Sequence, residues 1–457
     1  MNLALSLLLA LAWPKQGPPA PLVFEHVAVV PMDREIVLED HTVVVRDGRI
    51  AALGPASAVA VPADALHIDG RGHFLMPGLA DMHVHVWDEN DLYLFVANGV
   101  TTVRNMFGAP LHLDWRARIE RGELVGPRLY TAGPIIDGKP AVWPGSVELV
   151  DPGEAAAVVA AQKSAGYDFL KPYARLSREC YEALVSAGEE EGLRLMGHVP
   201  DALDLHEVLA ARQHTIEHMG GWAEAAQRAD SPLRANGFRS GFLAEQLAWQ
   251  TVDPERLAAL AKSVRAAEVW NCPTLVVLQK WTQGDDARAL LARPEMRYVS
   301  PFLRAFWDPG ARTNYLANLP AEDVLAARRS VPAMQRALAV LRDAGGGILL
   351  GTDMGNPYVV AGFAVHEELT NLIGAGLTPY EALRAATADA ARCMGAQDDW
   401  GTLAPGRRAD LILLSANPLT DVRHAAARVG VVLHGRWFPA AELTAELERR
   451  ALAFEAR

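Results

Sequence analysis

The chain has 457 residues, of which 50% are hydrophobic, and a formal net charge of −12. The negative charge and the absence of a Lys/Arg-rich stripe argue against nucleic acid or an anionic membrane surface as the main partner. Cys180, Cys272 and Cys393 are too few and too dispersed for a disulfide scaffold. We therefore expect one large domain with a smaller companion. We also expect a small molecule as the main partner and assembly as a homo-oligomer.

The first residues form a short apolar run from Met1 to Trp13. This run has the length of a signal-peptide core, is too short to span a bilayer, and offers small residues at Ala10 and Ala12 to a signal peptidase. No Lys or Arg precedes it, and a Pro/Gly-rich spacer follows from Pro14 to Pro21. We expect residues 1–21 to be a signal peptide and spacer, with export to the periplasm or the exterior. A buried N-terminal helix in a cytoplasmic protein is the alternative.

Both ends of the folded chain are rich in strand-forming residues. Val23 to Asp69 contains short β-type runs, with Asp47-Gly48 as a hairpin turn between two of them. The C-terminal part repeats this character at Ala409 to Leu414 and Val429 to Gly435. These patterns predict a small β-sandwich domain built from residues 22–74 and 402–440, followed by a C-terminal helix over 441–457.

Between these ends, over residues 75–401, strand-like runs alternate with stretches of helical spacing. Clear helical stretches run from Ser177 to Glu191, from Pro254 to Ala267 and from Ala321 to Arg342. The expected strands are the run ending at His83, Val100 to Asn105, Arg128 to Ala132, Asp168 to Tyr173, Leu193 to His198, His214 to His218, Val269 to Leu275 and Ile348 to Asp353. Eight strand-then-helix units predict an α/β fold with a (β/α)₈ barrel, whose sites lie at the carboxyl ends of the strands.

Metal-competent side chains fall at those strand ends. His83 and His85 are one residue apart, so both imidazoles of this strand can point to one side and reach one metal ion. The other candidate residues close later strands, and they are Lys171, His198, His218 and Asp353. Each residue alone is a weak signal, but their equivalent positions predict one shared pocket.

Lys171 is unusual among these residues because an ammonium group cannot bind a cation. It lies in the apolar run Phe169-Leu-Lys-Pro-Tyr173, in a chain with only six lysines among 43 basic residues. Desolvation and nearby cations favour its neutral amine, which can add carbon dioxide to give a carbamate able to bridge two metals. Snorkelling to solvent or pairing with Asp168 is the ordinary alternative for a lysine, and the histidines at matching strand ends favour the carbamate.

The chain resembles the amidohydrolase superfamily, in particular the carbamylated-lysine, binuclear-metal branch related to imidazolonepropionase-like enzymes and metal-dependent Xaa-Pro dipeptidases. The resemblance covers nearly everything from Val23 to about Val432. The segments that carry it are Leu75 to His85, Asp168 to Tyr173, Gly197 to Pro200, Thr215 to His218, Gly351 to Asp353 and Gly401 to Leu411. Their joint order is specific for the branch and uninformative about the substrate.

The resemblance implies two divalent metal ions, with zinc as the default. It assigns His83, His85 and Asp353 to the more buried ion, His198 and His218 to the more exposed ion, and N6-carboxylysine at Lys171 to the bridge. A bridging hydroxide is then expected to attack the substrate carbonyl. The resemblance also implies that the catalytic residue Asp353 takes the proton of that hydroxide and delivers it to the leaving amine.

Family analogy predicts a prolidase-like hydrolase of C–N amide bonds in dipeptides or N-acyl amino acids. Alternatives on the same fold are a hydrolytic deaminase, a lactone or ester hydrolase, and a non-enzymatic scaffold. Tyr173 and Arg104 are the candidate substrate contacts, although a rim aromatic and a structural ion pair explain them equally well. Asp81 and Glu217 are possible orienting partners for a histidine ligand.

Overall fold

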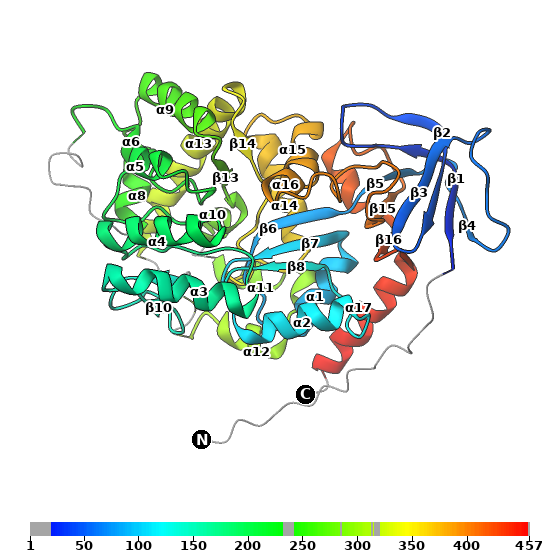
Figure 1. The fold of residues 1–457 in the computed structure, drawn as a ribbon, viewed down its shortest axis with the longest axis horizontal. Helices are drawn as coiled ribbons and strands as arrows, with labels where there is room; N and C mark the ends of the chain where they lie inside the picture. The colour runs from blue at the N-terminus through cyan, green and yellow to red at the C-terminus, as the bar shows by residue number, and fades with distance from the viewer. Residues whose placement is uncertain (1–19, 232–241, 284–285, 312–313, 315–319, 456–457) are drawn as a thin grey trace.

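The computed structural model describes residues 20–231, 242–283, 286–311, 314 and 320–455. The expected signal peptide and spacer therefore lie almost wholly outside the described residues. Figure 1 shows the strands of both chain ends gathered on one side of the molecule, with the alternating helices and strands filling the rest. Within the described ranges, no helix is both long enough and apolar enough to cross a membrane.

One eight-stranded sheet combines strands from the two ends of the chain. Its path runs β17-β16-β15-β5-β1-β2-β3, and β4 pairs with β1. The strands are β1 (Leu22–Val29), β2 (Leu38–Arg46), β3 (Arg49–Pro55), β4 (Leu66–Asp69), β5 (Phe74–Pro77), β15 (Leu411–Leu414), β16 (Arg428–Leu433) and β17 (Arg436–Pro439). All belong to one sheet, so a separate sandwich of two sheets is not confirmed.

The predicted hairpin at Asp47-Gly48 joins β2 to β3. Both turn residues have positive φ, 50° at Asp47 and 73° at Gly48. Such φ values suit the two-residue turns whose twist matches that of the flanking strands. A glycine and an aspartate tolerate this backbone, which explains why the local sequence predicted the turn.

The middle of the chain forms short parallel strands. A three-stranded sheet has the order β6-β7-β8 and a four-stranded sheet the order β11-β12-β13-β14. These strands are β6 (Leu79–Val84), β7 (Val100–Asn105), β8 (Arg128–Thr131), β11 (Met196–Gly197), β12 (Thr215–Glu217), β13 (Trp270–Cys272) and β14 (Gly347–Ile348), and a small pair is formed by β9 (Ile136–Asp137) and β10 (Val147–Glu148).

Single parallel bridges continue the pairing between these sheets. Ala132 pairs with Phe169, and Leu170 pairs with Leu195. On the other side, the Met82 backbone N–H donates to the Leu350 carbonyl at 2.9 Å. Parallel contacts therefore lead from β8 through residues 169–170 to β11, and from the end of β14 back to β6.

The expected strand from Asp168 to Tyr173 differs most from the structure. It is represented only by the bridges of Phe169, Leu170 and Pro172. Pro172 has no N–H to donate, which prevents a continuous hydrogen-bond ladder at this position. The segment still runs beside its neighbours, so Lys171 keeps its place at the end of the strand row.

Helices alternate with these strands, and two of them begin at the capping residues that the sequence offers. Ser177 accepts a hydrogen bond from the Cys180 N–H at the start of α4, and Asp253 caps α9. The helices are α1 (Glu89–Ala97), α2 (Pro110–Glu120), α3 (Ala155–Ala165), α4 (Arg178–Glu191), α5 (Leu205–Ala210), α6 (Trp222–Ala225), α8 (Phe242–Trp249), α9 (Pro254–Ala266), α10 (Leu275–Thr282), α11 (Ala287–Leu291), α12 (Pro301–Phe306), α13 (Ala321–Asp343), α14 (Phe363–Gly374), α15 (Pro379–Ala385), α16 (Ala388–Cys393) and α17 (Ala440–Glu455).

Arg428 of β16 joins the eight-stranded sheet to the helices of the middle region. Its guanidinium donates to the Ala97 carbonyl at 3.0 Å and to the Asn98 side-chain oxygen at 3.2 Å. It therefore satisfies the Ala97 carbonyl at the end of α1 and also holds the Asn98 side chain. This contact fixes the sheet beside the first strand-helix unit, which carries His83 and His85.

Candidate metal centre

The ends of β6 and β14 hold three of the predicted residues together. The Asp353 N–H donates to the His83 carbonyl at 2.8 Å, and the His85 N–H donates to the Met354 carbonyl at 2.7 Å. His83 Nε2 lies 3.4 Å and His85 Nε2 3.2 Å from Asp353 Oδ1. One donor atom from each of these residues lies within 4.8 Å of the others, which suits a shared metal ion.

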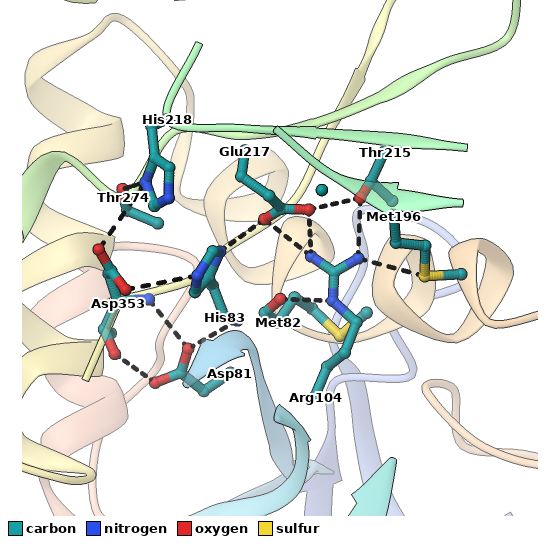
Figure 2. Close-up of polar contacts among 12 residues, drawn as sticks. Asp81, Met82, His83, Arg104, Met196, Thr215, Glu217, His218, Thr274 and Asp353 are labelled. Carbon is teal, nitrogen blue, oxygen red and sulfur yellow. Dashed lines mark hydrogen bonds and ion pairs between the residues drawn. The ribbon is translucent and has the colours of Figure 1, made fainter. Parts of the chain in front are cut away.

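The predicted histidines of the neighbouring strands complete the group. The ring centroids of His83 and His218 are 4.6 Å apart, and those of His198 and His218 are 4.9 Å apart. His218 Nδ1 lies 3.9 Å from Asp353 Oδ2 (Figure 2). The His83 side chain is only 1% exposed, whereas His85 and His218 are 18% and 24% exposed. The group therefore has a buried end at His83 and reaches solvent near His85 and His218.

Glu217 fixes the orientation of His83. His83 Nδ1 donates to Glu217 Oε2 at 2.7 Å, so the Nε2 lone pair is left facing Asp353 (Figure 2). Burial raises the pKa of Glu217, but the charges of Arg104 and Lys171 outweigh burial and hold it below its usual value. Burial lowers the pKa of His83 well below its usual value. A neutral imidazole oriented by an ionised carboxylate is the arrangement that metal ligation requires.

Arg104 does not have the position expected for a substrate contact. Its side chain is fully buried, and it donates to both oxygens of Glu217 at 2.9 and 3.0 Å. It also donates to the Met82 carbonyl at 2.5 Å and to Thr215 Oγ1 at 3.1 Å. The guanidinium neutralises a buried carboxylate behind His83, which is the ion-pair alternative considered from the sequence. The structure therefore shows Arg104 in the ion pair with Glu217, and substrate contact by Arg104 stays a prediction.

Lys171 lies inside this group without an ordinary partner. The residue is 1% exposed, and its Nζ has no hydrogen-bond partner. Asp168 instead binds Arg116 at 2.8 Å and accepts the Thr131 N–H at 2.8 Å. Lys171 therefore neither pairs with Asp168 nor extends to solvent. Burial lowers its pKa to about 8, so the neutral amine is accessible near neutral pH.

Tyr173 and Thr274 contact His198 and His218. The Tyr173 ring stacks on His198 with centroids 4.1 Å apart, and its OH accepts a 2.8 Å hydrogen bond from Trp143 Nε1. Burial raises the pKa of Tyr173, so its phenol keeps a proton that it can donate. His218 Nδ1 is hydrogen-bonded to Thr274 Oγ1 at 2.7 Å, which leaves its other nitrogen free.

Asp81 holds the Asp353 loop against β6. It accepts hydrogen bonds from the Thr352 N–H at 2.9 Å and the Thr352 hydroxyl at 2.6 Å, and from the His83 N–H at 3.3 Å. It therefore contacts backbone and hydroxyl groups in place of an imidazole. Asp353 and His218 have φ of 57° and 59°, a backbone region that costs non-glycine residues free energy and that persists where tertiary contacts enforce it.

Several buried polar atoms of the centre have no hydrogen-bond partner in the part of the chain that the structure describes. They are His83 Nε2, His85 Nδ1 and Lys171 Nζ. An unpaired buried polar atom costs about 1–3 kcal/mol, and a bound cation or carbamate relieves this cost. A second set, His83, Glu217 and Cys272, is equally compact, but its His83 nitrogen and its carboxylate are already paired with each other. The donors present fit a metal held by His83, His85 and Asp353.

The sequence did not reveal most of the groups that position the ligands. Thr274 and Thr352 act through single hydroxyl contacts made across the fold, and Trp143 reaches Tyr173 from a loop. Glu217 was visible as a neighbour of His218 in sequence, yet it orients His83. His218 follows the end of β12 with a φ of 59°, so it does not continue the alternation of the strand, and both side chains reach His83.

Comparison with known proteins agrees with this geometry. A model described as the amidohydrolase family matches residues 74–438. An imidazolonepropionase of Deinococcus deserti is 39% identical over 102 residues, which cover 20% of this chain and 25% of the relative. The matches to curated relatives span between 10% and 25% of the relatives' own length.

Two solved structures are similar over nearly the whole chain. A bottromycin amidohydrolase is 26% identical with a TM-score of 0.73, and the match covers 95% of this chain and 90% of that one. A putative prolidase from Bifidobacterium longum is 24% identical with a TM-score of 0.70, covers 95% and 100%, and shows a common fold. The chain has the α/β fold of these proteins. With the family model matched from β5 to β17, it belongs to the amidohydrolase family and is an enzyme.

Proposed function

We propose that this chain is a metal-dependent hydrolase of C–N amide bonds in dipeptides or N-acyl amino acids. Its family supports a hydrolase that uses a divalent metal ion. The observation that carries the finer proposal is Lys171, a lysine with an unpartnered Nζ buried among histidines and Asp353. Carbamylation by carbon dioxide turns this amine into a carboxylate-like ligand, which explains why a lysine occupies a position that otherwise suits a metal-binding oxygen.

The proposed arrangement assigns His83, His85 and Asp353 to one ion, His198 and His218 to a second, and carbamylated Lys171 to both. When bound, divalent ions at this site supply Lewis acidity and lower the pKa of water towards about 7, as zinc does in hydrolytic enzymes. The default ion is zinc, because imidazole and carboxylate donors suit it.

The surrounding residues then supply proton transfer and a hydrogen-bond donor for amide hydrolysis. Burial raises the pKa of Asp353, but His83 and His218 outweigh it, so the pKa lies below its usual value and the carboxylate starts ionised. Asp353 can therefore accept a proton from water and pass it to the leaving amine. The protonated Tyr173 hydroxyl stands beside His198, where it can donate to the substrate carbonyl oxygen.

We also propose that the parallel strands close into a (β/α)₈ barrel over residues 75–401, flanked by a small β domain from residues 22–74 and 402–440. The backbone contact between Met82 and Leu350 supports closure, since it joins the last strand region to the first. Closure explains why residues far apart in sequence meet at one end of the strand row.

The names of the similar structures support amide substrates. One is a putative prolidase and another a bottromycin amidohydrolase. A hydrolytic deaminase is the main rival, and family members of that kind do not need a carbamylated lysine. Lys171 favours the amide hydrolase.

The deciding experiment measures metal content, carbamylation and activity on the same preparation. We expect two metal equivalents per chain, a carbamate ¹³C signal after incubation with ¹³C-bicarbonate, and release of free amino acid from members of a dipeptide and N-acyl amino acid panel. The carbamate signal should be absent in Lys171→Ala. One metal equivalent in fully active protein, with no carbamate signal, would refute the binuclear proposal. Ammonia release from an aminopurine or aminopyrimidine, without amide cleavage, would favour the deaminase.

A further inference from the structure

Exposed aromatic rings lie beside the candidate metal centre. Trp87, two residues beyond His85, is 47% exposed, and its ring stacks on that of His85 with centroids 6.5 Å apart and planes 27° apart. Phe107 packs edge-on against Trp87 at 6.3 Å and 80°. Trp87 is therefore a solvent-exposed ring that contacts both a predicted metal ligand and Phe107.

The loop after β8 extends this row of rings to the other side of the centre. A Cβ placed on Gly145 would lie 3.7 Å from Phe107 Cζ, so the loop passes close to that ring. Trp143, two residues earlier, is 39% exposed and donates its indole N–H to Tyr173, whose ring stacks on His198. We call Trp87, Phe107, Trp143 and Tyr173 the aromatic arc, because their contacts lead from His85 round to His198.

The arc is held in place by polar contacts of the loop. Fully buried Asp137 accepts hydrogen bonds from the N–H groups of Gly138, Val142 and Arg175 at 2.9, 2.8 and 2.7 Å. Arg175 Nη1 also donates to the Pro140 carbonyl at 2.6 Å. The loop that carries Trp143 is thus fixed at both its base and its tip.

Trp87 is fixed by a glycine of the Asp353 loop. Gly355 has a φ of 109°, and a Cβ there would lie 2.7 Å from Trp87 Nε1 and 2.7 Å from the His85 carbonyl oxygen. Only a residue without a side chain lets the indole lie against this loop. The ring position therefore depends on the same two segments that supply His85 and Asp353.

Ordinary packing does not explain these two tryptophans. Trp222, Trp249 and Trp307 are between 0% and 2% exposed, as expected for rings that fill a core. Of the tryptophans the structure describes, Trp87 and Trp143 alone are among its exposed large apolar side chains. Both lie on the arc, and each contacts a residue next to, or in, the candidate metal centre.

We propose that the aromatic arc is the wall that binds an aromatic or large apolar group attached next to the scissile C–N bond. This proposal rests on the proposed amide hydrolysis and narrows its substrate class. Rings held in advance lose little freedom when a ligand stacks on them, and their exposed faces gain from being covered. Small aliphatic substrates would leave the arc in water and gain nothing from it.

The test compares N-benzoyl-L-alanine and N-acetyl-L-phenylalanine with N-acetyl-L-alanine. In the metal-loaded wild-type enzyme we expect kcat/KM for at least one aromatic probe to exceed that of N-acetyl-L-alanine about tenfold or more, mainly through KM. Trp87→Ala should reduce this ratio at least about fivefold, while Trp87→Phe should retain most of it. Trp143→Phe, which keeps a ring and removes the donor to Tyr173, should have an intermediate effect.

Phe302→Ala is the matched control, since Phe302 is 61% exposed and its ring contacts Phe306 in place of the arc. It should leave the ratio between probes unchanged. Thermal unfolding of each variant reports whether the fold is intact. A wild type without aromatic preference, or a ratio that Trp87→Ala leaves unchanged, would overturn the proposal.

Binding of N-benzoyl-L-alanine to the metal-free protein, measured by equilibrium dialysis, separates the arc from the chemistry. If neither these probes nor any member of the dipeptide and N-acyl amino acid panel is cleaved, the proposed amide hydrolysis fails. Dialysis then still tests whether the aromatic arc binds the probe. An affinity that is about fivefold weaker in Trp87→Ala than in wild type supports the proposal. No binding to wild type, or equal affinity in the two proteins, overturns it.

Discussion

Lys171 and Lys280 are both buried lysines, yet their surroundings differ in kind. Lys171 is 1% exposed, and its Nζ has no partner. Lys280 of α10 is 2% exposed, but its Nζ donates to Glu367 Oε2 of α14 at 2.6 Å, and Arg293 binds the same carboxylate. Burial lowers the pKa of both amines. The α10–α14 junction is therefore a satisfied ion pair, whereas the candidate metal centre has a buried amine without a hydrogen-bond partner among the described residues.

The carboxylates of the two regions sharpen this contrast. Glu367 forms ion pairs with Lys280 and Arg293, and these two pairs account for its role. Glu217 is also neutralised by an arginine, but its second function is to hold His83 Nδ1. One region uses its charges to join two helices, and the other uses them to orient a side chain toward a ligand.

Replacing Lys171 should have the largest effect on activity. We expect Lys171→Ala to lower kcat/KM about a thousandfold, equivalent to about 4 kcal/mol, because the bridging ligand is lost. Its thermal unfolding should change little, since no hydrogen bond is removed. Lys280→Ala is the matched control and should keep wild-type kcat/KM. Equal activity losses in the two variants would show that burial alone, and not bridging, makes a lysine essential here.

Glu217→Gln should weaken metal binding about 10- to 100-fold, as for other groups that orient a histidine ligand. The amide keeps the size of the side chain but is a poorer acceptor for His83 Nδ1 and leaves Arg104 without a counter-charge. Competition with a chromophoric chelator measures the affinity. Glu367→Gln serves as the control, and a similar loss of affinity in it would contradict the orienting role of Glu217.

Lys280→Met should act on stability in place of catalysis. It removes the partner of Glu367 at the α10–α14 junction, and we expect the free energy of unfolding to fall by about 1–3 kcal/mol. Arg293 still binds Glu367, which limits the loss. Urea-induced unfolding measures this change in the free energy of unfolding. Lys171→Met, measured alongside, should cost less, because an apolar side chain leaves no partner behind; the reverse order would contradict the comparison.

The smallest expected effect concerns acid stability. Burial raises the pKa of Glu367, but the interactions with Arg293 and Lys280 outweigh burial. The folded-state pKa of Glu367 therefore lies below the usual 4.5. The unfolded chain then takes up the proton first, and this stabilisation is present above pH 4.5 and lost as the pH falls through the folded-state pKa. Glu367→Gln should therefore lose less unfolding free energy than wild type between about pH 5 and about pH 3. An unchanged slope would contradict the pairing.

Local signals in the sequence predicted the regular elements well where a single feature fixed them. The strand expected from Val100 to Asn105 and the hairpin at Asp47-Gly48 agree with the structure. Asp168 to Tyr173 did not form a regular strand, because Pro172 interrupts its ladder. Strand residues between two neighbours need continuous N–H donors, which apolar character alone does not reveal.

The candidate site divides in the same way. The placement of His83, His85 and Asp353 at strand ends was visible in the chain, and the structure brings their donor atoms together. The role of Arg104 was not visible, because a charge near a strand end can face the substrate or a buried carboxylate, and only the packing of Glu217 decides between them.

The sequence by itself determined which chemical groups are available and that they lie at equivalent strand ends. Periodicity fixes the side of a strand on which each group lies, and this suffices to predict convergence. Tertiary structure alone decided which of these groups are satisfied. Glu217 meets Arg104, Asp168 meets Arg116, and Lys171 is left without a partner. It also decided that Trp87 and Trp143 lie exposed along one arc, because burial depends on neighbours distant in the chain.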